Sequence, residues 1–83
     1  MMLLYFAWVR QKLGTGEEQI DVPPGVGTVR ELAEHLHSRG GAFAEVFSDP
    51  KRLRAAVNQE YVIWDTPLET ATEVAFFPPV TGG

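Results

Sequence analysis

The sequence predicts an α+β fold, in which a mixed sheet of about five strands carries one main helix across one face. Two segments of strand composition precede a single well-capped amphipathic helix, and three more strand-like segments follow it. The chain has 83 residues, so these elements have to share one hydrophobic core.

Two strands are expected before the helix. Residues 3–10 (LLYFAWVR) are rich in aromatic and apolar side chains, which is typical of a strand, and the stretch KLGTG after them predicts a hairpin loop. Residues 17–22 (EEQIDV) alternate polar and apolar side chains, as a half-buried second strand does. The sequence PPGVG then predicts a loop that ends this strand.

The main helix is predicted to start at Thr28, because Thr28 and Glu31 have the T-x-x-E spacing of a capping box. Gly40 and Gly41 are expected to end it, and residues 42–47 (AFAEVF) to form a short second helical turn. Four apolar residues share one face of the main helix: Val29, Leu32, Ala33 and Leu36. The residues expected to be buried against Val29, Leu32 and Leu36 are Leu3, Tyr5, Val74 and Phe76.

Three strands are expected after the helix. Residues 53–58 (LRAAVN) and 61–64 (YVIW) are predicted to form a tight hairpin around Gln59 and Glu60. Residues 73–77 (EVAFF) form the last strand. We expect the first and last strands to pair in parallel at the centre of the sheet, because long connections permit this pairing and a hairpin does not. This arrangement is that of a ubiquitin-like β-grasp domain.

Both of these central strands are apolar on both faces. In the first strand Leu3, Tyr5, Ala7 and Val9 alternate with Leu4, Phe6 and Trp8, and in the last strand Val74 and Phe76 alternate with Ala75 and Phe77. One set can face the helix, but the other has no covering element. Two explanations remain: small domains often expose part of their large aromatic side chains, or the second set forms an apolar patch for a protein partner.

Residues 78–83 are expected to form a flexible tail on a globular domain of residues 1–77. Pro78 and Pro79 have no amide hydrogen and a fixed φ, so they should lift the chain off the sheet. Fully extended, this tail spans roughly 20 Å. Gly82 and Gly83 have no Cβ and can enter a narrow channel, although terminal glycines also occur in disordered chain ends.

Composition argues against several classes of function. The sequence has no cysteine, which excludes disulfides, thiolate metal sites and side-chain persulfides. Its net charge of -4, with seven basic residues spread along the chain, argues against nucleic-acid binding. No apolar run reaches the roughly 20 residues of a membrane span, and the first ten residues lack the features of a signal peptide. We therefore expect a cytoplasmic protein without a nucleic-acid or membrane partner.

The sequence has no pattern typical of a catalytic or metal site. His35 and His37 lie about 200° apart around the main helix, too far for a shared metal ion. Glu17, Glu18 and Asp21 are more typical of solvated strand edges than of a general acid and base. We expect no metal site, and no enzyme activity from the isolated chain.

The stretches AAVNQEYV and EVAFFPPVTGG, in a chain that starts LLYFAWVR, closely resemble the MoaD family, the small subunit of molybdopterin synthase. The resemblance implies the ubiquitin-like β-grasp fold and a sulfur carrier without a permanently bound cofactor. In this family an ATP-dependent, ubiquitin-activating-like enzyme (MoeB-like) adenylates the C-terminal glycine, and a sulfur donor converts it to a thiocarboxylate. The large synthase subunit (MoaE-like) then uses the sulfur to build the dithiolene of molybdopterin.

By position, the resemblance implies that Gly83 carries the sulfur and that Gly82 passes through a channel of the partner. Phe6, Tyr61 and Phe77 match the family's apolar contact surface. The remaining tail residues are also expected to contact a partner, namely Pro78, Pro79, Val80 and Thr81. The sequence ETATEV departs from the DGDEV turn that the family often has, which leaves the geometry of that turn open.

Three other functions remain as alternatives. A ThiS-like carrier of the thiazole pathway shares the fold and the Gly-Gly end, but FFPPVTGG resembles the molybdopterin branch better. A ubiquitin-like modifier of lysines uses the same adenylate. A partner-only adaptor keeps the apolar face and does not need a free terminus.

Overall fold

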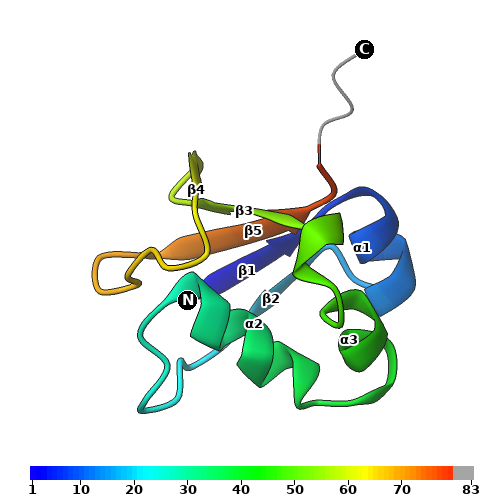
Figure 1. Ribbon diagram of the computed structural model, residues 1–83, viewed down its shortest axis with the longest axis horizontal. Helices are drawn as coiled ribbons and strands as arrows, with labels where there is room; N and C mark the ends of the chain where they lie inside the picture. Colours follow the sequence, from blue (N-terminus) through cyan, green and yellow to red (C-terminus); the bar gives the residue numbers. More distant parts are fainter. Residues whose placement is uncertain (80–83) are drawn as a thin grey trace.

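A five-stranded mixed sheet forms the centre of the computed structural model, which describes residues 1–79 (Figure 1). Its strands are β1 (Met2–Tyr5), β2 (Glu17–Gln19), β3 (Arg54–Val57), β4 (Glu60–Val62) and β5 (Glu73–Phe77), in the spatial order β2-β1-β5-β3-β4. β1 and β5 run parallel at the centre, and the other neighbouring strands are antiparallel. The predicted mixed sheet and its central parallel pair are confirmed.

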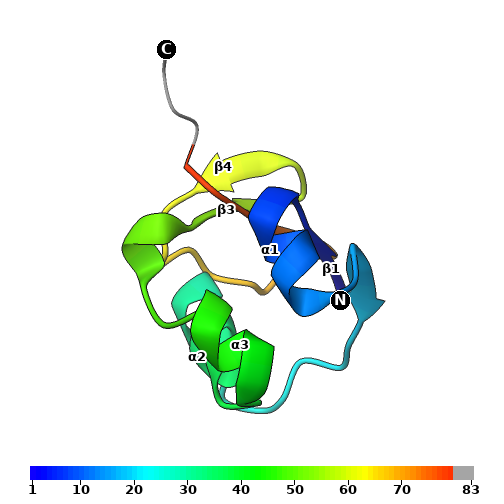
Figure 2. The same ribbon diagram turned by 90° about the vertical axis from the view of Figure 1, so that its right-hand side faces the viewer.

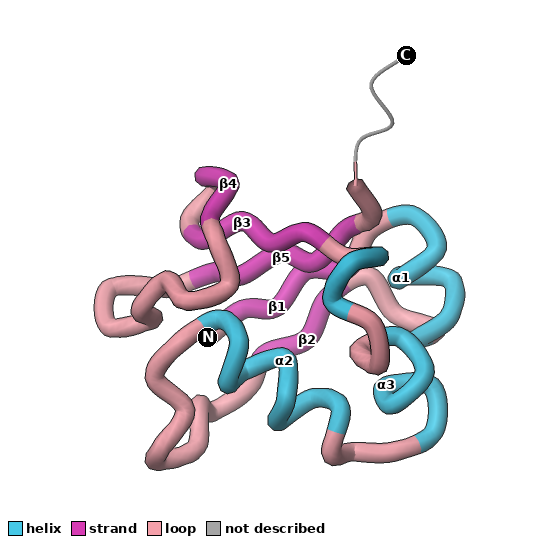
Figure 3. The backbone as a smooth tube through the Cα atoms, viewed as in Figure 1, coloured by secondary structure: helices cyan, strands magenta, loops and turns pink. Residues whose placement is uncertain are grey.

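Three α-helices and one short 3-10 helix complete the part of the chain that the structure describes. They are α1 (Ala7–Leu13), α2 (Val29–His37), α3 (Gly41–Val46) and η1 (Pro50–Arg52). α2 lies across one face of the sheet, as predicted, and contacts α3 (Figure 3). None of these helices is long and apolar enough to cross a membrane.

The main helix begins as predicted. The Thr28 Oγ1 accepts a hydrogen bond from the Glu31 N–H at 3.2 Å, and the Glu31 carboxylate accepts one from the Gly27 N–H at 3.1 Å. The first bond satisfies an amide group that a helix start leaves open, and the second binds the Glu31 side chain to the residue before the cap. α2 already ends at His37, before the two predicted stop residues, and Gly40 and Gly41 use positive φ angles of 77° and 56° to turn the chain into α3.

One apolar core holds α2 against the sheet. The helix residues Val29, Leu32 and Leu36 are buried, and so are their predicted strand partners Leu3, Tyr5, Val74 and Phe76. Phe47, which follows α3, packs edge-on against Phe76 with ring centroids 5.0 Å apart. The predicted helix face is confirmed.

A hydrogen-bonded cluster of three side chains lies at one edge of this core. The Tyr5 hydroxyl donates a hydrogen bond to the Glu18 carboxylate at 2.7 Å, and Arg39 donates to the same oxygen at 2.6 Å. Burial raises the pKa of the Tyr5 hydroxyl, and the hydrogen bond to Glu18 acts in the same direction. The three residues tie β1, β2 and the turn after α2 together.

The first strand is shorter than predicted, because residues 7–13 form α1. Val9 and Leu13 are one helical turn apart and both pack on the core, and Gly14 ends the helix in the left-handed region at a φ of 78°. The aromatic and apolar composition of this stretch favours a strand, but tertiary packing outweighs that propensity. β1 and β2 are therefore joined through a helix, and the predicted hairpin loop is wrong.

The second hairpin turns one residue earlier than predicted. Its turn residues are Asn58 and Gln59, with positive φ angles of 49° and 71°, and β4 already begins at Glu60. A two-residue turn of this kind needs positive φ at both positions, and asparagine tolerates that region better than most residues. The conformational tolerance of Asn58 therefore sets the position of the turn.

Asn58 also shapes the loop before β5, whose sequence ETATEV departs from the pattern of the MoaD family. Its Oδ1 accepts hydrogen bonds from the N–H groups of Thr72 at 2.9 Å and Glu73 at 3.1 Å, and its Nδ2 donates to the Thr70 carbonyl at 3.2 Å. One side chain thus binds the backbone of this loop at three points and aligns the start of β5.

We expect Leu32→Ala to lower the free energy of unfolding by about 2 to 5 kcal/mol, because Leu32 is fully buried between α2 and the sheet. Denaturant melts of both chains measure this loss. Glu34→Ala on the exposed side of α2 is the matched control and should change the free energy of unfolding by less than about 0.5 kcal/mol. A Leu32→Ala loss as small as that of the control contradicts the core assignment.

Asn58→Ala should lower the free energy of unfolding by about 2 kcal/mol, because it places alanine at a positive φ and removes the bonds to the loop. Asn58→Gly loses the same side-chain bonds but adopts positive φ freely, so its loss should be smaller by about 1 kcal/mol. Thermal melts compare the two variants. Equal losses would show that the backbone conformation at Asn58 does not contribute.

Candidate functional site

The face of the sheet turned away from α2 has no helix packed on it in the described residues. Figure 2 shows α2 and α3 together on one side of the strands. The ladder register runs across the open face: Leu4 lies opposite Ala75, Ala75 opposite Ala56, and Ala56 opposite Tyr61. We call this surface the outer face and define it by Leu4, Phe6, Ala56, Tyr61, Ala75 and Phe77.

A hollow of about 430 Å³ lies on the outer face. The small side chains of Ala56 and Ala75 leave space there, and Phe6, Tyr61 and Phe77 stand around it. Phe6 is 47% and Tyr61 77% exposed, and the rings of Tyr61 and Phe77 have centroids 5.3 Å apart. The structure therefore brings together the three residues predicted to form an apolar contact surface, with room between them for a partner's side chain.

The tail leaves the sheet beside this hollow. β5 ends at Phe77, and its parallel pairing with β1 places that end next to the end of β1, where the Phe6 N–H donates to the Phe76 carbonyl at 3.2 Å. Pro78 and Pro79 follow outside any strand, half-buried against the domain. The predicted tail residues Val80, Thr81, Gly82 and Gly83 lie outside the described residues.

Known proteins resemble this chain along almost its whole length. The model of the ThiS family matches residues 3–83. The chain belongs to the ThiS family. The molybdopterin synthase sulfur carrier subunit of Escherichia coli (strain K12) is 44% identical over 81 residues, which are 98% of this chain and 96% of that protein. This likeness confirms the resemblance to the MoaD family.

Two solved structures share the fold of this ThiS-family chain. The "Putative molybdopterin converting factor, subunit 1" from Pyrococcus furiosus has a TM-score of 0.72 and 36% identity, and the match covers 95% of each chain. SAMP1 from Haloferax volcanii has a TM-score of 0.73 and 26% identity, with 99% of this chain and 97% of that chain covered. The predicted ubiquitin-like β-grasp fold is confirmed.

The exposed apolar residues of this ThiS-family domain differ from the sequence prediction at two places. Trp8, predicted to share the outer face, lies in α1, together with Ala7 and the buried Val9. Ile63, which the prediction omits, follows β4 and is 74% exposed. In the strand predicted over YVIW, alternation puts Ile63 on the side of Tyr61, so the sequence contained a signal for its exposure.

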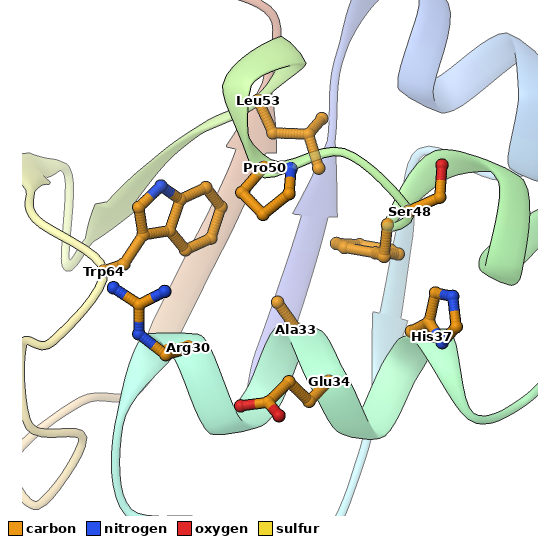
Figure 4. A pocket seen from close by; sticks show the side chains of 9 residues that line it. Arg30, Ala33, Glu34, His37, Ser48, Pro50, Leu53 and Trp64 are labelled. Atoms are coloured by element: carbon orange, nitrogen blue, oxygen red, sulfur yellow. The ribbon is translucent and has the colours of Figure 1, made fainter.

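A second hollow, of about 520 Å³, lies on the helix side of the sheet (Figure 4). Its lining includes Arg30, Ala33, Glu34 and His37 from α2, with Pro50 and Trp64 opposite them. The Arg30 guanidinium pairs with the Asp65 carboxylate at 2.8 Å. The Trp64 ring stacks on Phe76, which is part of the core on the helix side. This hollow and the outer face therefore lie on opposite sides of the sheet.

Metal-binding groups do not gather around either hollow. Among residues 1–79, no group of three or more His, Cys, Asp or Glu side chains is placed to hold a metal ion. The outer face offers apolar contact beside the point at which the tail leaves β5, and together they are the candidate site.

Proposed function

We propose that this chain is the sulfur carrier subunit of molybdopterin synthase and that Gly83 carries the sulfur. The observation that supports this most strongly is the 44% identity to a protein of that name along 98% of the chain. The geometry agrees with it, because an open apolar face adjoins the point at which the tail leaves the domain.

The chemistry starts at the terminal carboxylate of Gly83. A free α-carboxyl group has an ordinary pKa of about 3.3 to 3.7, so it is an unreactive anion at neutral pH and has to be activated. In the reaction that we propose, a carboxylate oxygen attacks the α-phosphorus of ATP on a ubiquitin-activating-like enzyme, and pyrophosphate leaves. A sulfur nucleophile from a donor, at the oxidation level of sulfide, then attacks the carbonyl carbon and AMP leaves. The product is a thiocarboxylate, which is itself a sulfur nucleophile.

The tail is suited to deliver this group into an enclosed site. Residues 78–83 reach roughly 20 Å when extended, so the terminus can enter a partner while the domain stays outside. Gly82 and Gly83 have no Cβ and pass a channel of main-chain width. The sequence has no cysteine, so the sulfur has to travel on the main-chain carboxyl group.

The outer face would supply recognition by the large synthase subunit. Phe6, Tyr61 and Phe77 are aromatic and stand around a hollow, and such residues dominate the binding energy of protein interfaces. Docking there would hold the domain beside the mouth of a channel, because the tail leaves from the same edge of the sheet.

A thiazole-pathway carrier is the second candidate, favoured by the family model that matches residues 3–83, which is that of ThiS. It would use the same adenylate and thiocarboxylate but a different acceptor for the sulfur. A ubiquitin-like modifier would instead join Gly83 to a lysine.

One experiment distinguishes these functions. The intact mass after incubation with ATP, an activating enzyme and a sulfur source distinguishes a thiocarboxylate from a lysine conjugate. The identity of the molecule that accepts the sulfur distinguishes the two carriers.

Phe77→Ala should weaken binding to the large subunit by more than about 1 kcal/mol, because it removes an aromatic anchor from the outer face. Tyr61→Ala should act in the same direction with an unchanged melting curve, since Tyr61 is 77% exposed. Titration calorimetry measures both affinities, and Gln19→Ala on β2 is the exposed control. Native affinity in both aromatic variants would show that the outer face does not bind this subunit.

One alanine added after Gly83, or Gly82→Val, should abolish sulfur transfer, because the reacting carboxyl group is displaced or the channel is blocked. Thermal melts should stay unchanged. The assay measures thiocarboxylate formation by intact mass and molybdopterin synthesis in the reconstituted system. An extended chain that transfers sulfur at the native rate, without first being trimmed, would eliminate the role proposed for Gly83.

A further inference from the structure

We propose that three cations at the base of the tail dock on an acidic rim of the activating enzyme, around the channel that takes up the tail. These cations, Lys51, Arg52 and Arg54, are called the basic collar. The inference rests on the proposed function, because it requires an enzyme that receives the terminus.

The basic collar lies at the end of the sheet from which the tail leaves. Arg54 begins β3 and is the ladder partner of Phe77, the last residue of β5. Lys51 and Arg52 belong to η1, which lies at that end of the domain in two views (Figures 1 and 2). All three residues are exposed, so a protein that surrounds the tail can reach them.

Two of the collar side chains are held in place by contacts that leave their charge uncompensated. The Arg52 guanidinium lies over the Trp8 ring of α1, 4.6 Å from its centroid. The Arg54 Nη1 donates to the Leu53 carbonyl at 2.7 Å. Both contacts orient a cation without pairing it to a carboxylate.

The charge of the collar contrasts with the rest of the chain. The net charge is -4, yet three of the seven basic residues fall within residues 51–54. Three of the other four form ion pairs: Lys12 with Glu45, Arg30 with Asp65, and Arg39 with Glu18. Within residues 1–79 no carboxylate forms an ion pair with a collar side chain. The nearby Asp49 carboxylate accepts a hydrogen bond from the backbone N–H of Lys51 at 3.0 Å and so caps η1.

Exposed charges at the rim of an interface mainly raise the association rate. A carrier has to bind its activating enzyme and leave it again in every cycle, so fast association without slow dissociation is an advantage. Larger apolar contacts act mostly on dissociation. Three cations on an acidic chain are also too few to hold nucleic acid, which leaves an acidic protein surface as the complementary partner.

The test compares association rates with the activating enzyme by stopped-flow fluorescence over a range of salt concentrations. The double variant K51Q/R52Q should associate about tenfold more slowly than the native chain at low salt. In about 1 M salt, where the screening length is about 3 Å, the difference should shrink to less than about twofold. K51E should act in the same direction and leaves the contact between Arg52 and Trp8 intact.

The matched control is K12Q/R30Q, which removes the same charge from two cations that are already paired elsewhere. It should associate within about twofold of the native rate. Thermal melts establish that each variant is folded. If the collar variants associate as fast as the control while the native chain is bound and adenylated, the collar proposal is wrong. If the native chain is neither bound nor adenylated, the proposed function itself fails, and the collar proposal with it.

Discussion

The parallel pairing of β1 with β5 sets the position of every feature that the proposed function uses. Parallel strands end at the same edge of a sheet, so the chain leaves β5 beside the end of β1, as the bond from the Phe6 N–H to the Phe76 carbonyl shows. An antiparallel pair would have released the tail at the opposite edge, beside Met2. Because both strands are central, the tail exit and the middle of the outer face lie on the same pair of hydrogen-bonded strands.

The two faces of these strands differ in what covers them. On the helix side, large side chains from the central strands are buried under α2. On the outer side, Ala56 and Ala75 occupy neighbouring strands, and their small side chains leave a hollow between aromatic residues. Exposed apolar surface of this kind supports the protein-binding role that we propose for the outer face. The outer face thus combines exposed aromatic rings with space between them.

The local conformations that keep this arrangement in register come from a few special residues. Asn58 adopts positive φ in the second hairpin and bonds the loop that leads into β5. Gly14 ends α1 in the left-handed region and returns the chain to β2. Arg52 covers the Trp8 ring, so a side chain that composition assigns to a strand becomes part of a contact between α1 and η1. These contacts fix the start of β5, the return to β2 and the packing of α1 against η1.

The sequence by itself determined the capped main helix, its buried face, the last strand and the family, because capping spacing and apolar periodicity are local signals at Thr28, Glu31 and Leu32. Apolar composition could not distinguish a strand from a helix at Val9, because both bury that residue and only the packing of α1 on the core decides. The basic collar is visible as a run of cations, but its place beside Phe77 follows from the pairing of β3 with β5. That placement joins residues distant in the sequence, so only the tertiary structure determined it.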